Sequence, residues 1–288
     1  MNAKNTDFST KTTLNCNGLL LDISKPAVMG IINTTPDSFY QSAKKISVHD
    51  VLILAEKMIK EGAAILDVGG MSSRPGATFV EEEEELVRVI PAIEAIHSHF
   101  PNQIISIDTC KSRVAHEAIF SGASMVNDIS AGAFDKNLWQ TVAALKVPYV
   151  LMHMQGTPAT MQANPTYYDV VKEVVEFFKQ NIFRLNSFGI FDIILDPGFG
   201  FGKTVSHNYK LLNQFEIFNL FGLPLMAGLS RKSLICKVLK VNPAYALNGT
   251  TVLNTLSLLK GAKILRVHDV MQAQEAIKLI EALDDAAI

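Results

Sequence analysis

The sequence predicts an α/β protein, a single-domain (β/α)8 TIM barrel with a short strand or hairpin extension at its N-terminus. The main observation is a repeated unit. Eight short aliphatic or β-branched runs each end in a polar, chemically capable residue, and amphipathic helical stretches follow them. Strands that alternate with helices form parallel βαβ units, and eight such units close a barrel. The length of 288 residues agrees, since one barrel occupies roughly 200 to 400 residues.

The polar residues that end the expected strands are the first candidates for binding and catalysis. The active site of such a barrel lies where the C-terminal ends of its strands meet. In chain order, the expected strands and the residues that end them are Val28–Ile32 with Asn33, Ala64–Leu66 with Asp67, Ile104–Ile107 with Asp108, Ser124–Val126 with Asn127, Tyr149–Met152 with His153, Ile193–Leu195 with Asp196, Leu225–Leu229 with Ser230, Arg231 and Lys232, and Lys263–Val267 with Arg266 and His268.

Apolar residues at helical spacing predict the helices, and several of these stripes end at a glycine, a common helix stop. They cover Val51–Ile59, Glu84–His99, Tyr167–Phe188, Leu211–Phe218, Thr251–Leu259 and Ala273–Leu283. Pro91 lies inside the second stripe and predicts a kink or a restart there. Gly18–Asp22 predicts a short strand or hairpin that covers the N-terminal mouth of the barrel. We expect residues 1–13 to form a flexible tail and residues 14–288 to form the barrel domain.

Composition excludes several classes of function. The net charge of −2 supplies no global field to recruit nucleic acid or an anionic membrane. No apolar run approaches the roughly 18 residues that span a bilayer, and residues 1–11 lack the apolar core of a signal peptide. Cys16, Cys110 and Cys236 are odd in number and widely spaced, so we expect packed thiols rather than disulfides or a zinc site. These features predict a cytoplasmic protein.

Three strand-end residues predict a site for a polar heterocycle. Asp108, Asn127 and Asp196 end the third, fourth and sixth strands. A carboxylate can accept both a ring N–H and an exocyclic amine of an aminopyrimidinone, and an asparagine offers a donor and an acceptor together. A divalent metal cluster or simple helix caps are the alternatives. The glycine-rich segment from Asp196 to Thr204 has neither Walker nor dinucleotide-fold spacing.

Basic residues at the last two strands predict an anion site. Barrels often bind phosphate through the loops after strands seven and eight, and Ser230-Arg231-Lys232 and Arg266-Val267-His268-Asp269 lie there. The alternative is that Arg231 or Arg266 pairs with a neighbouring acid of the scaffold. The segments that start at Asn33 and Gly69 contain Pro, Gly and Ser and are suited to closing over a ligand. Asn33 could supply a neutral oxygen ligand to Mg²⁺.

Taken together, these segments closely resemble the dihydropteroate synthase family from about Leu14 to the C-terminus. The segments that carry the resemblance, in family order, are Met29–Phe39, Asp67–Ala77, Ser106–Thr109, Asn127–Ile129, Leu151–Gly156, Asp196–Lys203, Ser230–Lys232 and Arg266–Asp269. The family joins 6-hydroxymethyl-7,8-dihydropterin diphosphate to 4-aminobenzoate. The products are 7,8-dihydropteroate and pyrophosphate, in folate biosynthesis. The resemblance therefore implies a transferase that acts on small-molecule substrates, is a target of sulfonamides as aminobenzoate mimics, and is commonly a homodimer.

The resemblance also implies a role for each site residue. The pterin would be held by Asp108, Asn127, Asp196 and Lys232, in a pocket lined by Met152 and Phe201. Asn33 would bind the Mg²⁺ cofactor, and Arg266 and His268 would take the diphosphate. The aminobenzoate would be framed by Ser73, Arg74, Pro75 and Ser230. Asp108, Lys232, Arg266 and His268 are the expected catalytic residues.

The sequence departs from the family pattern at three places. Tyr40-Gln41-Ser42-Ala43 replaces the usual Ser-Asp-Gly-Gly, Met71 replaces a Glu, and Ser73 replaces a Thr while keeping the hydroxyl. The altered first loop suggests one alternative, a non-catalytic pterin-binding paralogue. The other alternative is a methyltetrahydrofolate-dependent methyltransferase of the same superfamily, which would need neither the Arg266/His268 pair nor the Ser-Arg-Pro loop.

Overall fold

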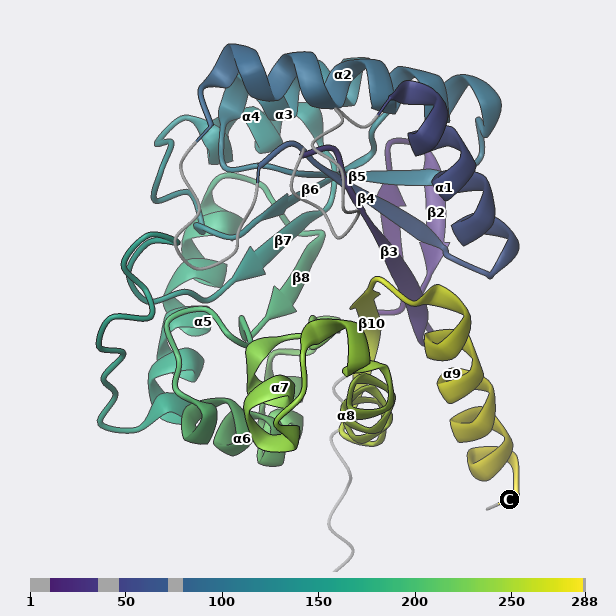
Figure 1. Cartoon of the computed structure of the whole chain (residues 1–288). Helices are drawn as coiled ribbons and strands as arrows, with labels where there is room; N and C mark the ends of the chain where they lie inside the picture. Colours follow the sequence, from purple (N-terminus) through teal and green to yellow (C-terminus); the bar gives the residue numbers. More distant parts are fainter. Residues whose placement is uncertain (1–10, 36–46, 72–79, 287–288) are drawn as a thin grey trace, which may run out of the picture.

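The computed structural model of this chain describes residues 11–35, 47–71 and 80–286. Within these residues, eight parallel strands pair in the closed order β10-β3-β4-β5-β6-β7-β8-β9. Helices surround the strands (Figure 1). The predicted TIM barrel is therefore confirmed. The strands are β3 (Ala27–Asn33), β4 (Ile65–Gly69), β5 (Ile104–Asp108), β6 (Met125–Asp128), β7 (Tyr149–Met152), β8 (Ile193–Asp196), β9 (Leu225–Ala227) and β10 (Ala262–Val267).

The helices between the strands follow the apolar stripes of the sequence. They are α1 (Val48–Lys60), α2 (Glu82–His99), α3 (Ser112–Phe120), α4 (Leu138–Leu145), α5 (Val170–Ser187), α6 (Val205–Asn213), α7 (Ser233–Leu239), α8 (Leu247–Leu259) and α9 (Val270–Asp285). Two 3-10 helices, η1 (Phe215–Phe221) and η2 (Pro243–Tyr245), lie between them. The expected single helix over Leu211–Phe218 is thus divided between α6 and η1.

Helix α2 continues through Pro91 without a break, so the restart that the sequence allowed there does not occur. A proline inside a helix removes one backbone hydrogen bond. Val89 before it and Ile93 and Ile96 after it are all fully buried against the strands. This packing on both sides of Pro91 holds the helix together.

An N-terminal hairpin closes the bottom of the barrel. Strands β1 (Thr13–Cys16) and β2 (Leu19–Asp22) pair in antiparallel fashion. Leu14, Cys16 and Leu21 are buried against one inward residue from each barrel strand, namely Met29, Ile65, Ile104, Met125, Val150, Ile194, Met226 and Ile264. The hairpin predicted to cover the N-terminal mouth is confirmed. Cys16 and Cys110 are buried and Cys236 is half-buried, all as free thiols.

The eight inward strand residues just named form an apolar plug, and most inward-facing side chains one layer above it are polar. Side chains along a strand alternate between two faces, so the residue two positions after each plug residue also points inward. In five strands that residue is polar: Asp67, Ser106, Asn127, Asp196 and Arg266 follow Ile65, Ile104, Met125, Ile194 and Ile264. The fold therefore collects charged groups at the C-terminal end of the barrel. None of the described helices is long and apolar enough to cross a bilayer.

Candidate functional site

A buried network of charges joins three strands at the C-terminal end of the barrel. The Arg266 guanidinium donates from Nε to Asp67 Oδ2 and from Nη2 to Asp108 Oδ2, both at 2.6 Å. Asn127 Nδ2 also donates to Asp67 Oδ2, at 3.0 Å. Residues 199 positions apart in the chain thus meet because β10 pairs with β3, and β3 with β4. Asp108 and Asn127 therefore lie close together, and Arg266 pairs with two acids, the alternative that the sequence left open for it.

A second set of groups lies at the end of β8. Asp196 is 3% exposed, and its Oδ1 accepts a 2.7 Å hydrogen bond from the backbone N–H of Gly198. Lys232 reaches toward the same region from the N-terminal end of α7. Its Nζ donates to the backbone carbonyl of Phe199 and lies 4.6 Å from the centre of the Phe201 ring. Asp196, Phe201 and Lys232 therefore lie together at the end of β8, which is separated from β10 and Arg266 by β9.

Burial shifts the ionisation of these groups, and their charged neighbours partly restore it. Burial raises the pKa of Asp108 to about 7, although the adjacent Arg266 guanidinium acts to lower it. Burial also raises the pKa of Asp196, against the lowering effect of Lys232. The pKa of Lys232 falls to about 8 by burial, while Asp196 pulls it upward. Asp108 and Lys232, whose pKa values lie near neutral pH, can therefore change their charge when a ligand binds.

Two predicted site residues, Ser230 and His268, lie together at the ends of the last two strands. Ser230 Oγ lies 3.0 Å from His268 Nδ1 and accepts a hydrogen bond from the His268 backbone N–H at 3.2 Å. Arg231 is turned away, because it forms a two-bond ion pair with Asp269, each bond 2.8 Å long. It also donates to the backbone carbonyls of Pro243 and Ala244, both in η2. For Arg231 the scaffold alternative is correct.

A small apolar cluster lines the space above these polar groups. Met152 and Phe201, both predicted as pocket residues, are buried with Cys110, Ile129 and Met161, and Met71, Phe134 and Met154 pack against them. Flat rings and thioethers make favourable contacts. The arrangement of carboxylates, an amide and a lysine beside this cluster suits a flat heterocycle with several N–H groups.

Asn33 alone cannot hold a metal ion and would need further ligands from other groups. It ends β3 and is half-buried. No group of three or more His, Cys, Asp or Glu among the described residues could hold a metal ion. Mg²⁺ commonly uses one or two protein oxygens and completes its shell with water and substrate phosphates. The side-chain oxygen of Asn33 would suit a magnesium ion that takes its other ligands from water and a phosphorylated substrate.

Comparison with known proteins identifies the family. The model of the family described as pterin binding enzyme matches residues 29–268. The dihydropteroate synthase of Escherichia coli (strain K12) is 46% identical over 267 residues, 92% of this chain and 94% of that protein. The Yersinia pestis dihydropteroate synthase, solved as a sulfonamide drug complex, superposes with a TM-score of 0.91 at 40% identity, covering 95% of this chain and 99% of that one. The chain belongs to the dihydropteroate synthase family. A further member, from Xanthomonas albilineans in complex with 7,8-dihydropteroate, gives a TM-score of 0.85 at 37% identity over 94% of this chain and 98% of that one.

Some predicted site residues of this family member fall outside the described residues, and two buried groups were missed. Ser73, Arg74 and Pro75 lie outside, as does the altered segment Tyr40–Ala43. Asp67 was noted only as a strand-end residue, although its inward position follows from the alternation that starts at Ile65. Lys203 was treated as the end of a turn, and nothing in its spacing indicates that it is 2% exposed.

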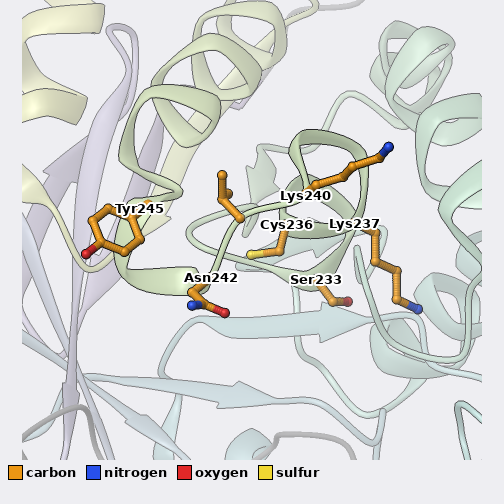
Figure 2. A pocket seen from close by; sticks show the side chains of 7 residues that line it. Ser233, Cys236, Lys237, Lys240, Asn242 and Tyr245 are labelled. Carbon is orange, nitrogen blue, oxygen red and sulfur yellow. The ribbon is translucent and has the colours of Figure 1, made fainter.

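A pocket of about 510 Å³ lies on the outer side of the barrel, along α7 and η2. Its polar lining includes Lys237, Lys240 and Asn242. Figure 2 shows the two lysine side chains extending in different directions instead of converging. A specific small-molecule site needs convergent polar groups, so the barrel mouth is the better candidate.

Proposed function

We infer that this chain is a dihydropteroate synthase, a transferase of folate biosynthesis. Its substrates are 6-hydroxymethyl-7,8-dihydropterin diphosphate and 4-aminobenzoate, and its products are 7,8-dihydropteroate and pyrophosphate. The observation that carries this conclusion is the juxtaposition of Asp108, Asn127, Asp196 and Lys232 at the barrel mouth, in a chain that belongs to the family. Both substrates are small molecules, and different side chains bind the pterin ring, the diphosphate and the aminobenzoate.

The pterin ring binds among the carboxylates. Asp196 and Asp108 accept hydrogen bonds from ring N–H and exocyclic amine groups, and Lys232 donates to the ring's acceptors. Asn127 already donates one N–H of Nδ2 to Asp67, which leaves its second N–H and its carbonyl oxygen for the ligand. Met152 and Phe201 contact the ring faces. The proposed arrangement accounts for charges kept at the bottom of an otherwise apolar pocket.

The diphosphate lies toward the ends of β9 and β10. His268 and the remaining N–H groups of Arg266 donate to its oxygens, since two of the five guanidinium N–H groups are used by Asp67 and Asp108. Mg²⁺, held by Asn33 and the phosphate oxygens, would neutralise charge on the leaving group. The aminobenzoate is framed by Ser230, with Ser73, Arg74 and Pro75 from the second loop, and sulfonamides compete for this place.

The reaction breaks the C–O bond between the pterin methylene and the diphosphate and forms a C–N bond to the arylamine. Pyrophosphate leaves with the bonding electron pair, and the amine nitrogen loses a proton. The electron-rich pterin spreads the positive charge that develops on the methylene, and Asp108 and Asp196 stabilise that charge electrostatically. Positioning of the weak arylamine nucleophile supplies much of the remaining rate enhancement.

The test is a pyrophosphate-release assay with Mg²⁺, the dihydropterin diphosphate and 4-aminobenzoate. We expect release that requires both organic substrates and is inhibited by a sulfonamide in competition with aminobenzoate. Tight pterin binding without pyrophosphate release would instead support the non-catalytic paralogue suggested by residues 40–43. Methyl transfer from methyltetrahydrofolate, with no pyrophosphate released, would support the methyltransferase.

We further propose that the chain is a cytoplasmic homodimer. Exposed apolar side chains gather on α7 and α8, which pack side by side (Figure 1). The residues are Val238, Leu239, Val252, Leu256 and Leu259, each at least 40% exposed. Apolar surface of this kind is typical of interfaces between subunits.

A further inference from the structure

Lys203, which lies in the chain between the end of β8 and the start of α6, has a buried amine. The side chain is 2% exposed. Its Nζ lies 2.9 Å from the carbonyl oxygen of Gly198, 3.0 Å from that of Phe201 and 3.2 Å from that of His153. It is also 2.9 Å from His153 Nδ1. Burial of a lysine is costly unless every N–H finds a partner, and here three of the four neighbours are carbonyl acceptors.

The protonation state follows from these partners. A carbonyl oxygen can only accept, so Nζ must donate toward the three carbonyls, whereas the imidazole nitrogen accepts or donates according to its tautomer. The three N–H groups of an ammonium can serve all three carbonyls and share one bond with the imidazole, whereas a neutral amine has only two N–H groups and leaves one carbonyl without a donor. These contacts favour the charged form, although burial lowers the pKa of Lys203. His153 then accepts at Nδ1 and carries its proton on Nε2. Burial, together with the charge of Lys203, lowers the pKa of His153, which is consistent with a neutral ring.

The amine joins two loops whose backbones are in direct contact. Gly198 and Gly202 have φ values of +69° and +61°, a region that glycine adopts without strain. A Cβ atom at Gly198 would overlap the carbonyl oxygen of His153, and one at Gly202 would overlap that of Gln155. The loops after β7 and β8 therefore pack too closely for a side chain at these two positions. The carbonyls of His153, Gly198 and Phe201, from both loops, converge on Nζ. A cation between them offsets the repulsion of these dipoles.

The same turn carries one wall of the site. The N–H of Gly198 binds Asp196, and the ring of Phe201 lies under Lys232. Since Lys203 holds the carbonyls of both Gly198 and Phe201, any movement of the turn would displace Asp196, Phe201 and Lys232 together. Lys203 itself has no accessible N–H to offer a substrate.

We propose that the Lys203 ammonium is an internal cation that positions the turn from Asp196 to Lys203, and through it the pterin-binding wall, without touching a substrate. This inference rests on the proposed function, because it assigns the turn to the pterin pocket. Lys203 is a positioning residue. Its loss acts on the affinity for the pterin and leaves the affinity for the aminobenzoate unchanged.

The first test compares Lys203→Met, which keeps most of the side-chain length but not the charge, with Lys210→Met. Lys210 lies on the neighbouring helix α6, is 43% exposed and pairs with Asp169, so it controls for the loss of a lysine. We expect Lys203→Met to weaken binding of the dihydropterin diphosphate about tenfold or more by calorimetry and to raise its KM. The KM for aminobenzoate stays unchanged, and the control behaves as wild type. A folded Lys203→Met with wild-type pterin affinity would overturn the inference.

Chemical rescue tests whether the charge of the Lys203 side chain is needed or only its volume. Lys203→Ala removes a fragment that corresponds to n-propylammonium. We expect n-propylammonium to restore pterin binding to this variant and n-propanol, which is neutral and of similar size, to fail. Equal restoration by both compounds would overturn the assignment of a charged amine.

A third measurement needs no variant and decides the matter if both variants fail to fold. Wild-type protein with lysine labelled by the heavy nitrogen isotope should show a slowly exchanging ammonium resonance, present with and without the pterin substrate. A neutral amine at Lys203 would overturn the proposal. Wild-type protein that binds no pterin would refute the proposed function, whereas unaltered binding by Lys203→Met refutes only this inference.

Discussion

At the residue scale, the site contains acidic and basic side chains whose pKa values burial shifts in favour of the uncharged forms. Burial raises the pKa of Asp196 and lowers that of Lys232 to about 8, while each acts on the other in the opposite direction. Arg266 lies between Asp67 and Asp108, and these carboxylates raise its pKa against the lowering effect of burial. Such groups are costly to maintain in a scaffold, and their concentration at one end of the barrel indicates a binding role.

Lys232 gives the site a pH dependence with a definite sign. A lysine carries its charge below its pKa and loses it above, so pterin binding should weaken as pH rises through about 8. We expect Lys232→Ala to weaken pterin binding severely near pH 7 and to remove this alkaline loss, measured by calorimetry across the pH range. Lys237→Ala, an exposed lysine of the same helix α7, serves as the control and should keep the wild-type profile. Unchanged pterin affinity in Lys232→Ala would refute the assignment.

At the scale of elements, the pattern of the sequence predicted the order and type of most strands and helices. The alternation along each strand also indicates which residues point inward, as for Asp67 after Ile65. The sequence could not predict that the stripe over Leu211–Phe218 divides between α6 and η1, because both helix types bury the same apolar residues. Nor could it predict that Lys203 turns inward, since that depends on carbonyls from a neighbouring loop.

The N-terminal hairpin should stabilise the barrel without contributing to the site. Leu14 is fully buried against the lower layer of the barrel, whereas Leu20 of the same hairpin is 73% exposed. We expect Leu14→Ala to lower the free energy of unfolding by about 2–5 kcal/mol and Leu20→Ala by less than about 0.5 kcal/mol, measured by urea denaturation. The rate of the folded Leu14→Ala enzyme should equal that of wild type. Equal destabilisation by the two substitutions would contradict the packing described here.

At the scale of the whole molecule, the exposed apolar face of α7 and α8 predicts self-association. Sedimentation of the wild type should give twice the chain mass of 31.6 kDa. We expect Leu256→Asp to shift the protein toward the monomer, because a carboxylate would be buried without a partner. Phe183→Asp changes a 76% exposed residue of α5 on another part of the surface and should leave the dimer intact. A wild-type protein that sediments as a monomer at micromolar concentration would refute the proposed homodimer.

The sequence alone determined the barrel, the end of it that carries chemistry, and the family, because hydrophobic periodicity and strand-end residues are local properties of the chain. Only the tertiary structure decided which charges meet. Arg266 could bind an anion or pair with an acid, and closure of the barrel places it between Asp67 and Asp108, far away in the chain. Arg231 instead joins Asp269 and belongs to the scaffold. Ion pairing depends on distances of a few ångströms between distant segments, and such distances exist only once the barrel has closed.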